Sequence, residues 1–260
     1  MIDILEAKKA FKEYVNNYDI KNIKIERKIA HTHRTVEVAK KIVEELQLDE
    51  ENKKLAELIA LLHDIGRFEQ VKRYNTYVDK NSVDHGDLGV EILFEQGLIK
   101  KFVEDRKYDK IIYLAIKNHN KFRIQEGLNE QELLHCKIIR DADKTDIFVA
   151  FLEETNKDGG TLYDYKEIGK QKLSEALLQG LREYKQVERK YMENEIDDYI
   201  NTITFLFDYN FSTGLRIIKE NNYIEKMINA INIHEETKEQ FNEILNIANT
   251  YIEKRIEKGC

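Results

Sequence analysis

The sequence predicts an all-α protein, and three of its features point that way. It contains no Pro and only 11 Gly among 260 residues, so few positions break a helix. Hydrophobic residues make up 42% and charged residues 35% of the chain, a mixture that suits amphipathic helices better than strand-rich folds. Apolar residues recur at the helical spacing i, i+3, i+4 in most segments, and no segment has a convincing strand pattern.

Helix-terminus signals divide the N-terminal half into separate helices. Asp49 and Asp84 stand where N-cap residues are expected, and Asn129 with Glu132 three residues later resembles a capping box. Gly66 is a candidate C-terminus for the helix that begins at Asp49. Together with the apolar periodicity, these signals predict helices over residues 1–18, 23–48, 49–66, 84–97, 107–119 and 129–143.

Two stretches lack this periodicity. Residues 67–84 are polar and aromatic, which predicts a loop, and NKDGGTLYDY at 156–165 is the clearest break in the chain. Apolar stripes beyond that break predict further helices within about 190–256. We therefore expect a core domain over residues 1–155 and a C-terminal helical extension over 156–260 that packs on the core.

The composition argues against several classes of protein. The formal net charge of −7 disfavours an extended nucleic-acid interface, which is normally basic. Cys136 and Cys260 form no CxxC motif, so we expect no disulfide framework and a reducing, cytoplasmic location. The N-terminus lacks a signal-peptide pattern, and no apolar run approaches the roughly 20 residues that span a bilayer, so no membrane partner is expected.

Four of the seven histidines stand at the ends or inner turns of four different predicted helices. These are His31, His63, His85 and His119. Helical bundles assemble metal cages in this way, from imidazoles and carboxylates that point inward from facing helices. Such ligands suit Mn, Fe, Co, Ni or Zn and exclude an all-thiolate site. His135 and His234 are expected to have structural roles.

The doublet His63–Asp64 carries the most specific signal. A His-Asp pair alone is weak evidence, but here it ends the apolar segment LIALLHDIGRFEQ, directly before Gly66 and Arg67. In this context the sequence resembles the HD superfamily of metal-dependent phosphohydrolases. The resemblance extends over about residues 25–150 and implies the helical bundle of an HD domain.

Two of the segments that carry the resemblance indicate which of two nearby residues is the metal ligand. HTHRTVEVAKKIVEEL looks like the opening helix of the family, in a register that makes His31 the ligand rather than His33. IIRDADKTDIF resembles the closing aspartate segment, where the A-D-K triplet points to Asp143 rather than Asp141. Asp141 would then be free to orient an imidazole without binding the metal itself.

Two further segments point to the branches of the family that bind two metals. SVDHGDLGVEIL and AIKNHNK look like the additional histidine motifs of those branches, and they supply His85 and His119. A mononuclear HD protein does not need this pair. The complete order H…HD…H…H…D therefore implies a second metal.

The resemblance implies that the ligands are divided between two metal ions. Asp64 would be the carboxylate that bridges both ions. The other ligands divide between one ion, held by His31, His63 and Asp143, and the other, held by His85 and His119. A metal-bound hydroxide would attack the substrate phosphorus. The implied cofactors are two divalent ions, with Mn, Fe, Co, Ni, Zn and Mg left open.

Charge that develops on phosphoryl oxygens calls for cations besides the metals. Arg67, beside the doublet, is the first candidate for this catalytic role, with a structural salt bridge as the alternative. Lys144 is the second candidate and Lys117 the third. The Tyr-rich loop 73–82, which contains Asp79, either lines the pocket or is an ordinary surface loop.

We therefore predict a phosphohydrolase or phosphodiesterase that acts on a nucleotide or another small phosphorylated compound. Two alternatives stay open: a mixed-valence di-iron oxygenase of the HD type, and a non-catalytic nucleotide-binding sensor. The absence of Pro counts against the G-Y-P branch that cleaves cyclic dinucleotides. A homo-oligomer is also left open, with the apolar stripes after residue 190 forming either core or its interface.

Overall fold

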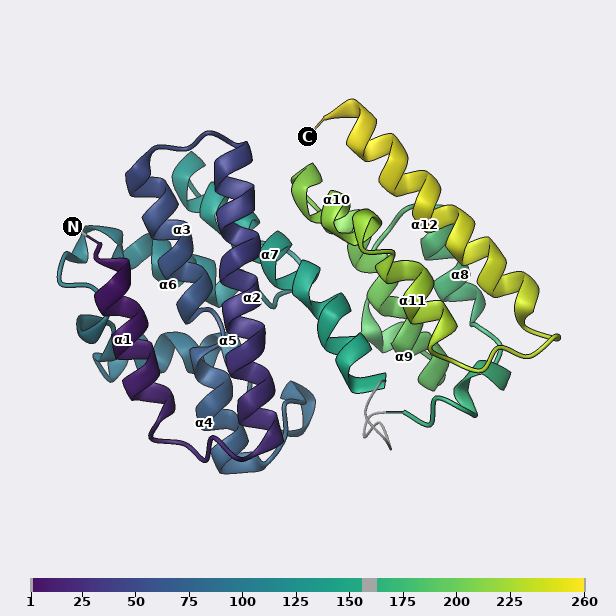
Figure 1. Ribbon diagram of the computed structural model, residues 1–260, viewed down its shortest axis with the longest axis horizontal. Coiled ribbons are helices and arrows are strands. Elements are labelled where there is room, and N and C mark those ends of the chain that lie inside the picture. The colour runs from purple at the N-terminus through teal and green to yellow at the C-terminus, as the bar shows by residue number, and fades with distance from the viewer. Residues whose placement is uncertain (1, 156–162, 260) are drawn as a thin grey trace. The chain divides into compact units, whose positions relative to one another are not determined.

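The computed structural model describes residues 2–155 and 163–259, which form helices and connecting turns with no strand among them (Figure 1). The all-α prediction is confirmed. Two compact units divide the chain, Met1–Asp143 and Lys144–Cys260. The expected domain boundary after residue 155 stays a prediction, and most of the break expected at 156–165 lies outside the described residues.

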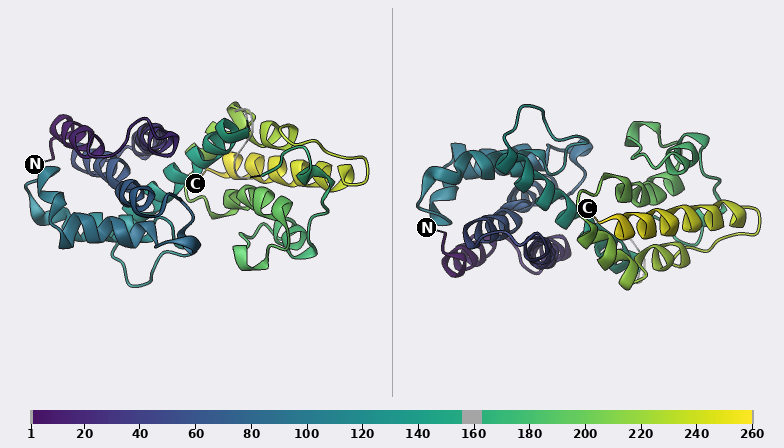
Figure 2. Two further views of the ribbon diagram at one scale, coloured as in Figure 1. Left: turned by 90° about the horizontal axis from the view of Figure 1, so that it is seen from below. Right: turned by 90° about the horizontal axis from the view of Figure 1, so that it is seen from above.

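The first unit is a bundle that brings several helices to one interior. Its helices are α1 (Ile4–Val15), α2 (Ile23–Glu45), α3 (Glu50–Leu62), α4 (Ile65–Tyr74), α5 (His85–Val90), α6 (Asp109–Asn118) and the part of α7 (Glu130–Thr155) up to Asp143. α2 packs along α3 (Figure 2). α5 contacts both α4 and α6. The core between them is aliphatic and includes the buried side chains of Ile42, Leu55, Leu58, Ile59 and Ile112.

The predicted helix caps are confirmed. The Asp49 carboxylate accepts a hydrogen bond from the Asn52 backbone amide at 2.8 Å and opens α3. Asp84 does the same for α5, through the amide of Asp87 at 3.0 Å. At the start of α7, Asn129 and Glu132 form the reciprocal pair of a capping box, with N···O distances of 3.0 and 2.9 Å.

The loop predicted for residues 67–84 is wrong in its first half, because α4 continues to Tyr74. Phe68 and Val71 turn inward one helical turn apart, and the Phe68 ring packs edge-on against Phe11 and Tyr14. Two inward apolar side chains are too few to establish a period in the sequence. Gly66 therefore lies inside the first turn of α4 and does not end a helix.

The helix expected over 84–97 is also more irregular than its sequence indicates. α5 ends at Val90 and is followed by a single π turn, Glu91–Glu95. Gly97 then ends the segment with a left-handed φ of 76°, the conformation in which glycine carries no steric penalty.

The second unit has an apolar core of its own. Its helices are the rest of α7, α8 (Glu175–Arg182), α9 (Glu195–Asn201), α10 (Ser212–Glu220), α11 (Tyr223–Asn229) and α12 (Lys238–Lys258). The long helix α12 contacts α8, α10 and α11. Tyr199 lies fully buried in this core and donates a hydrogen bond to the Met227 carbonyl at 2.9 Å. The apolar stripes after residue 190 thus contribute to this core.

Among the described residues, no helix combines the length and the apolar character needed to cross a membrane.

Candidate metal centre

Five elements of the first unit each contribute to one buried cluster. The residues come from the middle of α2, the α3–α4 junction, the first residue of α5, the end of α6 and α7. They are the six predicted ligands, His31, His63, Asp64, His85, His119 and Asp143. The four imidazoles and Asp64 are all at most 5% exposed, whereas the Asp143 side chain is 15% exposed.

His31, His63 and Asp143 form what we call the first histidine group. The His31 Nε2 atom lies 3.2 Å from His63 Nε2 and 3.0 Å from Asp143 Oδ1. The distance from His63 Nε2 to the same Asp143 oxygen is 3.7 Å. Asp64 Oδ2 faces this group, at 3.5 Å from His31 Nε2 and 3.7 Å from His63 Nε2.

His85 and His119 form the second histidine group, on the other side of Asp64. Their Nε2 atoms are 3.0 Å apart. The second carboxylate oxygen, Asp64 Oδ1, lies 3.5 Å from His85 Nε2 and 3.7 Å from His119 Nε2. Each oxygen of a single carboxylate therefore faces one histidine group, as a bridging ligand requires.

Hydrogen bonds at the opposite ring nitrogens fix the orientation of three imidazoles. His63 Nδ1 donates to the Ala60 carbonyl at 2.7 Å, and His119 Nδ1 donates to the Ile116 carbonyl at 2.6 Å. His85 Nδ1 lies 2.6 Å from Asp79 Oδ2. Because a carbonyl or an ionised carboxylate only accepts, Nδ1 carries the proton and the Nε2 lone pair faces inward.

The donor set fits divalent metal ions. The Nε2 lone pairs of His85 and His119, whose nitrogens are 3.0 Å apart, repel unless a cation lies between them. Imidazoles that share one ion at a bond length of about 2.0–2.1 Å have nitrogens about 2.8–3.4 Å apart at octahedral or tetrahedral angles. The three donors His31, His63 and Asp64, and likewise Asp64, His85 and His119, each lie close enough together to hold an ion.

The charge states of Asp64, Asp143 and His85 also suit cation binding. Burial acts to raise the pKa of Asp64, but the Lys28 ammonium and the neighbouring imidazoles hold it well below its usual range. Burial likewise acts to raise the pKa of Asp143, but the adjacent His31 and His63 hold it well below its usual range. Burial, aided by the Arg67 guanidinium, lowers the pKa of His85 to about 3. Ionised carboxylates and neutral imidazoles are the forms that ligate a metal.

Close backbone packing brings the second histidine group to Asp64. A Cβ atom on Gly66 would lie 2.4 Å from the His85 carbonyl oxygen and 2.7 Å from the Gly89 amide nitrogen. Only glycine permits this approach. α5 can therefore lie directly against the first turn of α4, next to the residue that bridges the two groups.

Arg67 lies beside the cluster and is held by several acceptors. Its Nη1 atom donates to Asp79 Oδ1 at 2.6 Å, to Gln70 Oε1 at 2.7 Å and to the Tyr77 carbonyl at 2.5 Å. Its Nε atom lies 3.6 Å from Asp64 Oδ1. Arg67 thus ties the loop after α4 to the centre, and its catalytic role stays a prediction.

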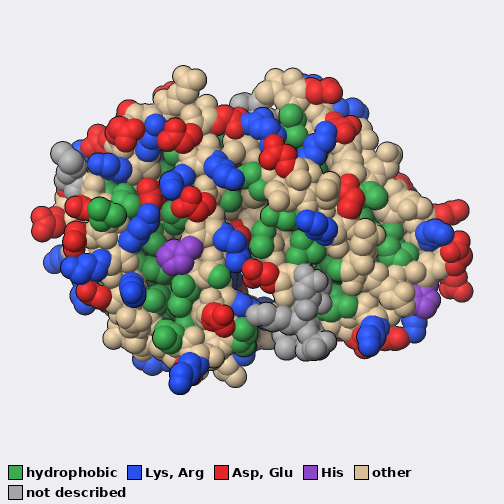
Figure 3. Space-filling model, viewed as in Figure 1, with side chains coloured by type: hydrophobic (Ala, Val, Ile, Leu, Met, Phe, Trp, Pro, Cys, Tyr) green, Lys and Arg blue, Asp and Glu red, His purple; other side chains and the backbone are tan. Residues whose placement is uncertain are grey.

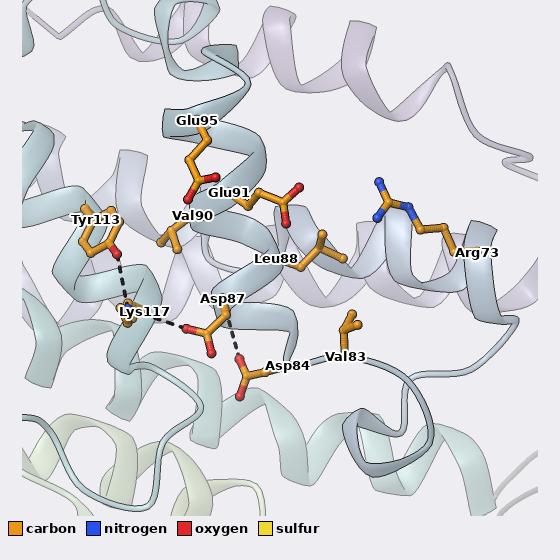
Figure 4. A pocket seen from close by; sticks show the side chains of 10 residues that line it. All are labelled: Arg73, Val83, Asp84, Asp87, Leu88, Val90, Glu91, Glu95, Tyr113 and Lys117. Atoms are coloured by element: carbon orange, nitrogen blue, oxygen red, sulfur yellow. Dashed lines mark hydrogen bonds and ion pairs between the residues drawn. The ribbon is translucent and has the colours of Figure 1, made fainter.

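The other two predicted cations each have a carboxylate partner of their own, and their catalytic roles stay predictions. Lys144 belongs to the second unit, where it pairs with Asp208. Lys117 lines a separate pocket of about 470 Å³ on α5 and α6, with its ammonium 3.2 Å from the Tyr113 hydroxyl and 4.0 Å from Asp87 (Figure 4).

His33 and Asp141 are the neighbours of two predicted ligands. His33 packs edge-on against the Phe11 ring, with ring centroids 6.0 Å apart. Asp141 is fully buried in α7, and its role in orienting an imidazole stays a prediction.

The sequence analysis missed the roles of two residues. Lys28 Nζ lies 2.8 Å from Asp64 Oδ2, and its position one turn before His31 is the signal that could have identified it. Asp79 contacts Arg67 through one oxygen and His85 through the other. Its loop was recognised as a candidate pocket wall, but no local pattern singled out this carboxylate.

The comparisons with known proteins agree with this geometry. A sequence model of the HD domain family matches residues 29–147. Neither the comparison with curated proteins nor that with solved structures found a match. The matched segment begins two residues before His31 and ends four residues after Asp143, so it contains all six residues of the cluster. Residues 29–147 therefore belong to the HD domain family.

Proposed function

We propose that the protein is a metal-dependent phosphohydrolase or phosphodiesterase that acts on a nucleotide or another small phosphorylated compound. The observation that carries this proposal is the position of Asp64. Its two oxygens lie 3.5 Å from His31 and 3.5 Å from His85, respectively, so one carboxylate joins two groups of imidazoles. Membership of the HD superfamily, which generally comprises metal-dependent phosphohydrolases, supports the same reaction class.

The proposed cofactors are two divalent ions, one at each histidine group. When bound, such ions lower the pKa of a water molecule and polarise the phosphoryl oxygens of a substrate. The chain itself orients the imidazoles, through the carbonyls of Ala60 and Ile116 and the carboxylate of Asp79. Arg67 and Lys28 place two positive charges beside Asp64, where an anionic substrate would bind.

A covalent nucleophile is not needed for this chemistry, and the sequence offers no Gly-x-Ser-x-Gly motif. Cys136 is fully buried, and burial raises the pKa of its thiol to about 12. It therefore stays a thiol near neutral pH. These observations favour direct attack by water over a two-step covalent route.

A small substrate is favoured over a nucleic-acid polymer. The chain carries a formal net charge of −7, and both signs of charge are interspersed over the face in Figure 3. A nucleic-acid polymer would need an extended basic surface. Two local cations beside a metal centre are sufficient for a phosphate group.

Elemental analysis of freshly purified protein, followed by a screen of phosphorylated metabolites with Mn²⁺, Co²⁺, Ni²⁺ or Mg²⁺ added, tests the proposal. Asp64→Ala should lose bound metal and turnover while staying helical by circular dichroism. Asp87→Ala is the matched control, since its carboxylate is 50% exposed and pairs with Lys121. Full activity in Asp64→Ala would overturn the proposal, and oxygen uptake by an iron-loaded protein that is inert toward phosphoesters would favour the oxygenase.

A further inference from the structure

Lys28 contacts the Asp64 carboxylate but is not one of the metal ligands, so the ligand set does not explain its position. We infer that Lys28 neutralises Asp64 while the centre is free of metal and binds a phosphoryl oxygen of the substrate once metal is present. This inference rests on the proposed function and extends it, because it names the residue that anchors the anionic part of the substrate.

The first step of the argument is the position of the ammonium group. Lys28 precedes His31 by one turn of α2, so both side chains lie on the same helix face. Its Nζ atom is 2.8 Å from Asp64 Oδ2, the oxygen that also faces His31 and His63 at 3.5 and 3.7 Å. Lys28 therefore contacts the carboxylate on the side of the first histidine group.

The second step is the confinement of the Lys28 side chain. Its ammonium lies 5.5 Å from the centre of the Tyr77 ring, within the range of a cation–π contact. Tyr77 is fixed at two points, because its carbonyl accepts from Arg67 and its hydroxyl donates to the Lys24 carbonyl. The side chain of Lys28 is still 19% exposed, so its ammonium has access to both Asp64 and solvent.

The third step concerns charge. A buried carboxylate without a partner is strongly destabilising, and Lys28 supplies a partner for Asp64 in the metal-free protein. A divalent ion held by the same oxygen would repel the ammonium of Lys28, which contacts that oxygen. Lys28 must then leave Asp64, and its flexible four-carbon stem allows this movement. A phosphoryl oxygen bound beside Asp64 is the anion that the released ammonium would meet.

The other cations near the ligands are less suited to this exchange. Arg67 Nη1 already donates to Asp79, Gln70 and the Tyr77 carbonyl, so moving it would break the loop contacts that orient His85. Lys144 pairs with Asp208 in the second unit. Lys28 contacts a ligand carboxylate directly, and metal binding itself weakens that contact.

The first measurement is Mn²⁺ binding to metal-free protein by calorimetry. Lys28→Met removes the competing cation and should bind Mn²⁺ about tenfold more tightly. Lys28→Arg keeps the charge and should match the wild type. Lys40→Met is the matched control, because Lys40 lies on the same helix, is 45% exposed and pairs with Glu37. Equal or weaker Mn²⁺ binding by Lys28→Met would overturn the inference.

The second measurement is the binding of inorganic phosphate to the Mn²⁺-loaded proteins. Lys28→Met should bind phosphate about tenfold more weakly than the wild type, the loss of one charge-assisted hydrogen bond. Lys28→Arg should retain most of the affinity, and Lys40→Met all of it. Unchanged phosphate affinity in Lys28→Met would refute the anchoring role.

The two binding measurements distinguish a failure of this inference from a failure of the proposed function. If wild-type protein binds no Mn²⁺ or hydrolyses no phosphorylated compound, the proposed function fails first. The role of Lys28 is tested by the ratio of variant to wild-type affinities. Circular dichroism checks that each variant is folded, and if Lys28→Met is not, Lys28→Gln carries the same two expectations because it is also neutral.

Discussion

Gly66 lies so close to His85 that a Cβ atom on it would be 2.4 Å from the His85 carbonyl oxygen. The missing side chain therefore sets the distance between α4, which begins beside Asp64, and α5, which begins with His85. We expect Gly66→Ala to lower the free energy of unfolding by about 1–3 kcal/mol, the usual cost of overpacking. It should also weaken Mn²⁺ binding, because His85 moves away from Asp64.

Gly89→Ala provides the control for this prediction. Its added Cβ would meet Ile116 Cγ2 at 3.4 Å and Ile65 Cγ2 at 3.5 Å, which is ordinary contact. We expect its stability to match or exceed the wild type by up to about 1 kcal/mol, since alanine favours a helix over glycine. Urea denaturation and Mn²⁺ titration measure both effects, and identical behaviour of the two variants would contradict the role given to Gly66.

Asp79 should control metal affinity without being a ligand. Its Oδ2 atom orients His85 at 2.6 Å, while its Oδ1 atom holds Arg67 at 2.6 Å. Asp79→Asn keeps the shape but loses the charge that fixes the His85 tautomer. The expected loss in Mn²⁺ affinity is about 10–100-fold, as for other carboxylates that support a ligating imidazole.

Asp87→Asn controls for the general effect of losing an acidic charge near α5. Its carboxylate pairs with Lys121 at 3.0 Å and contacts none of the cluster residues in the described structure. Calorimetric titration with Mn²⁺ should find its affinity unchanged. Equal affinities for Asp79→Asn and wild type would mean that His85 is oriented by other contacts.

Arg140 should stabilise the end of α6 that carries His119. Its buried guanidinium donates to the carbonyls of Asn118 at 2.9 Å, Lys121 at 2.5 Å and Phe122 at 3.3 Å. Asn118 is the last residue of α6, and the other two carbonyls belong to the turn after it, so the guanidinium joins the helix end to this turn. Arg140→Met removes these hydrogen bonds and should cost about 1–3 kcal/mol of unfolding free energy for each buried carbonyl left without a donor.

The substitution Arg140→Lys distinguishes geometry from charge. Lysine keeps the positive charge but cannot fork across three carbonyls, so we expect an intermediate loss of stability. Thermal denaturation measures the order of the three proteins. Stability equal to wild type in Arg140→Lys would show that charge alone is sufficient.

Local sequence patterns predicted the helices and the ligand types. Caps at Asp49 and Asp84 are encoded within three residues of each helix start, so they could be read directly. The order of the histidines and the doublet then identified the candidate ligands through the family resemblance. Each candidate ligand can be recognised from its position within its own short sequence motif.

Contacts between distant segments could not be predicted in this way. His85 and His119 lie 34 residues apart in sequence and 3.0 Å apart in space, a pairing that depends on how α5 packs against α6. Lys28 gave no signal, because a lysine on a helix is ordinarily exposed and only tertiary structure shows its carboxylate partner. The partners of Asp79 likewise come from α4 and α5, outside its own loop.

The last prediction concerns His135, which is fully buried on α7 and hydrogen-bonded to Asn52 Oδ1 at 3.0 Å. Since that oxygen only accepts, Nε2 carries the proton, and Nδ1 has no partner among the described residues. Burial lowers the pKa of His135 from 6.5 to about 4, although Asp49 acts in the opposite direction. Protonation would place a charge in the core without a partner at Nδ1.

Below pH 6.5 the unfolded chain therefore binds a proton at His135, whereas the folded chain binds this proton only at about pH 4. The unfolding free energy must fall over this interval, by about 3 kcal/mol in total from this residue. In His135→Gln the side chain can still donate to Asn52 but does not titrate, so its stability should fall less between pH 6.5 and pH 4. Urea denaturation of metal-free protein at several pH values measures the difference in unfolding free energy between the two proteins. The contributions of the other histidines cancel in this difference, because both proteins contain them. Parallel stability curves for the two proteins would show that His135 can be protonated in the folded state at no cost, contrary to its enclosure between α3 and α7.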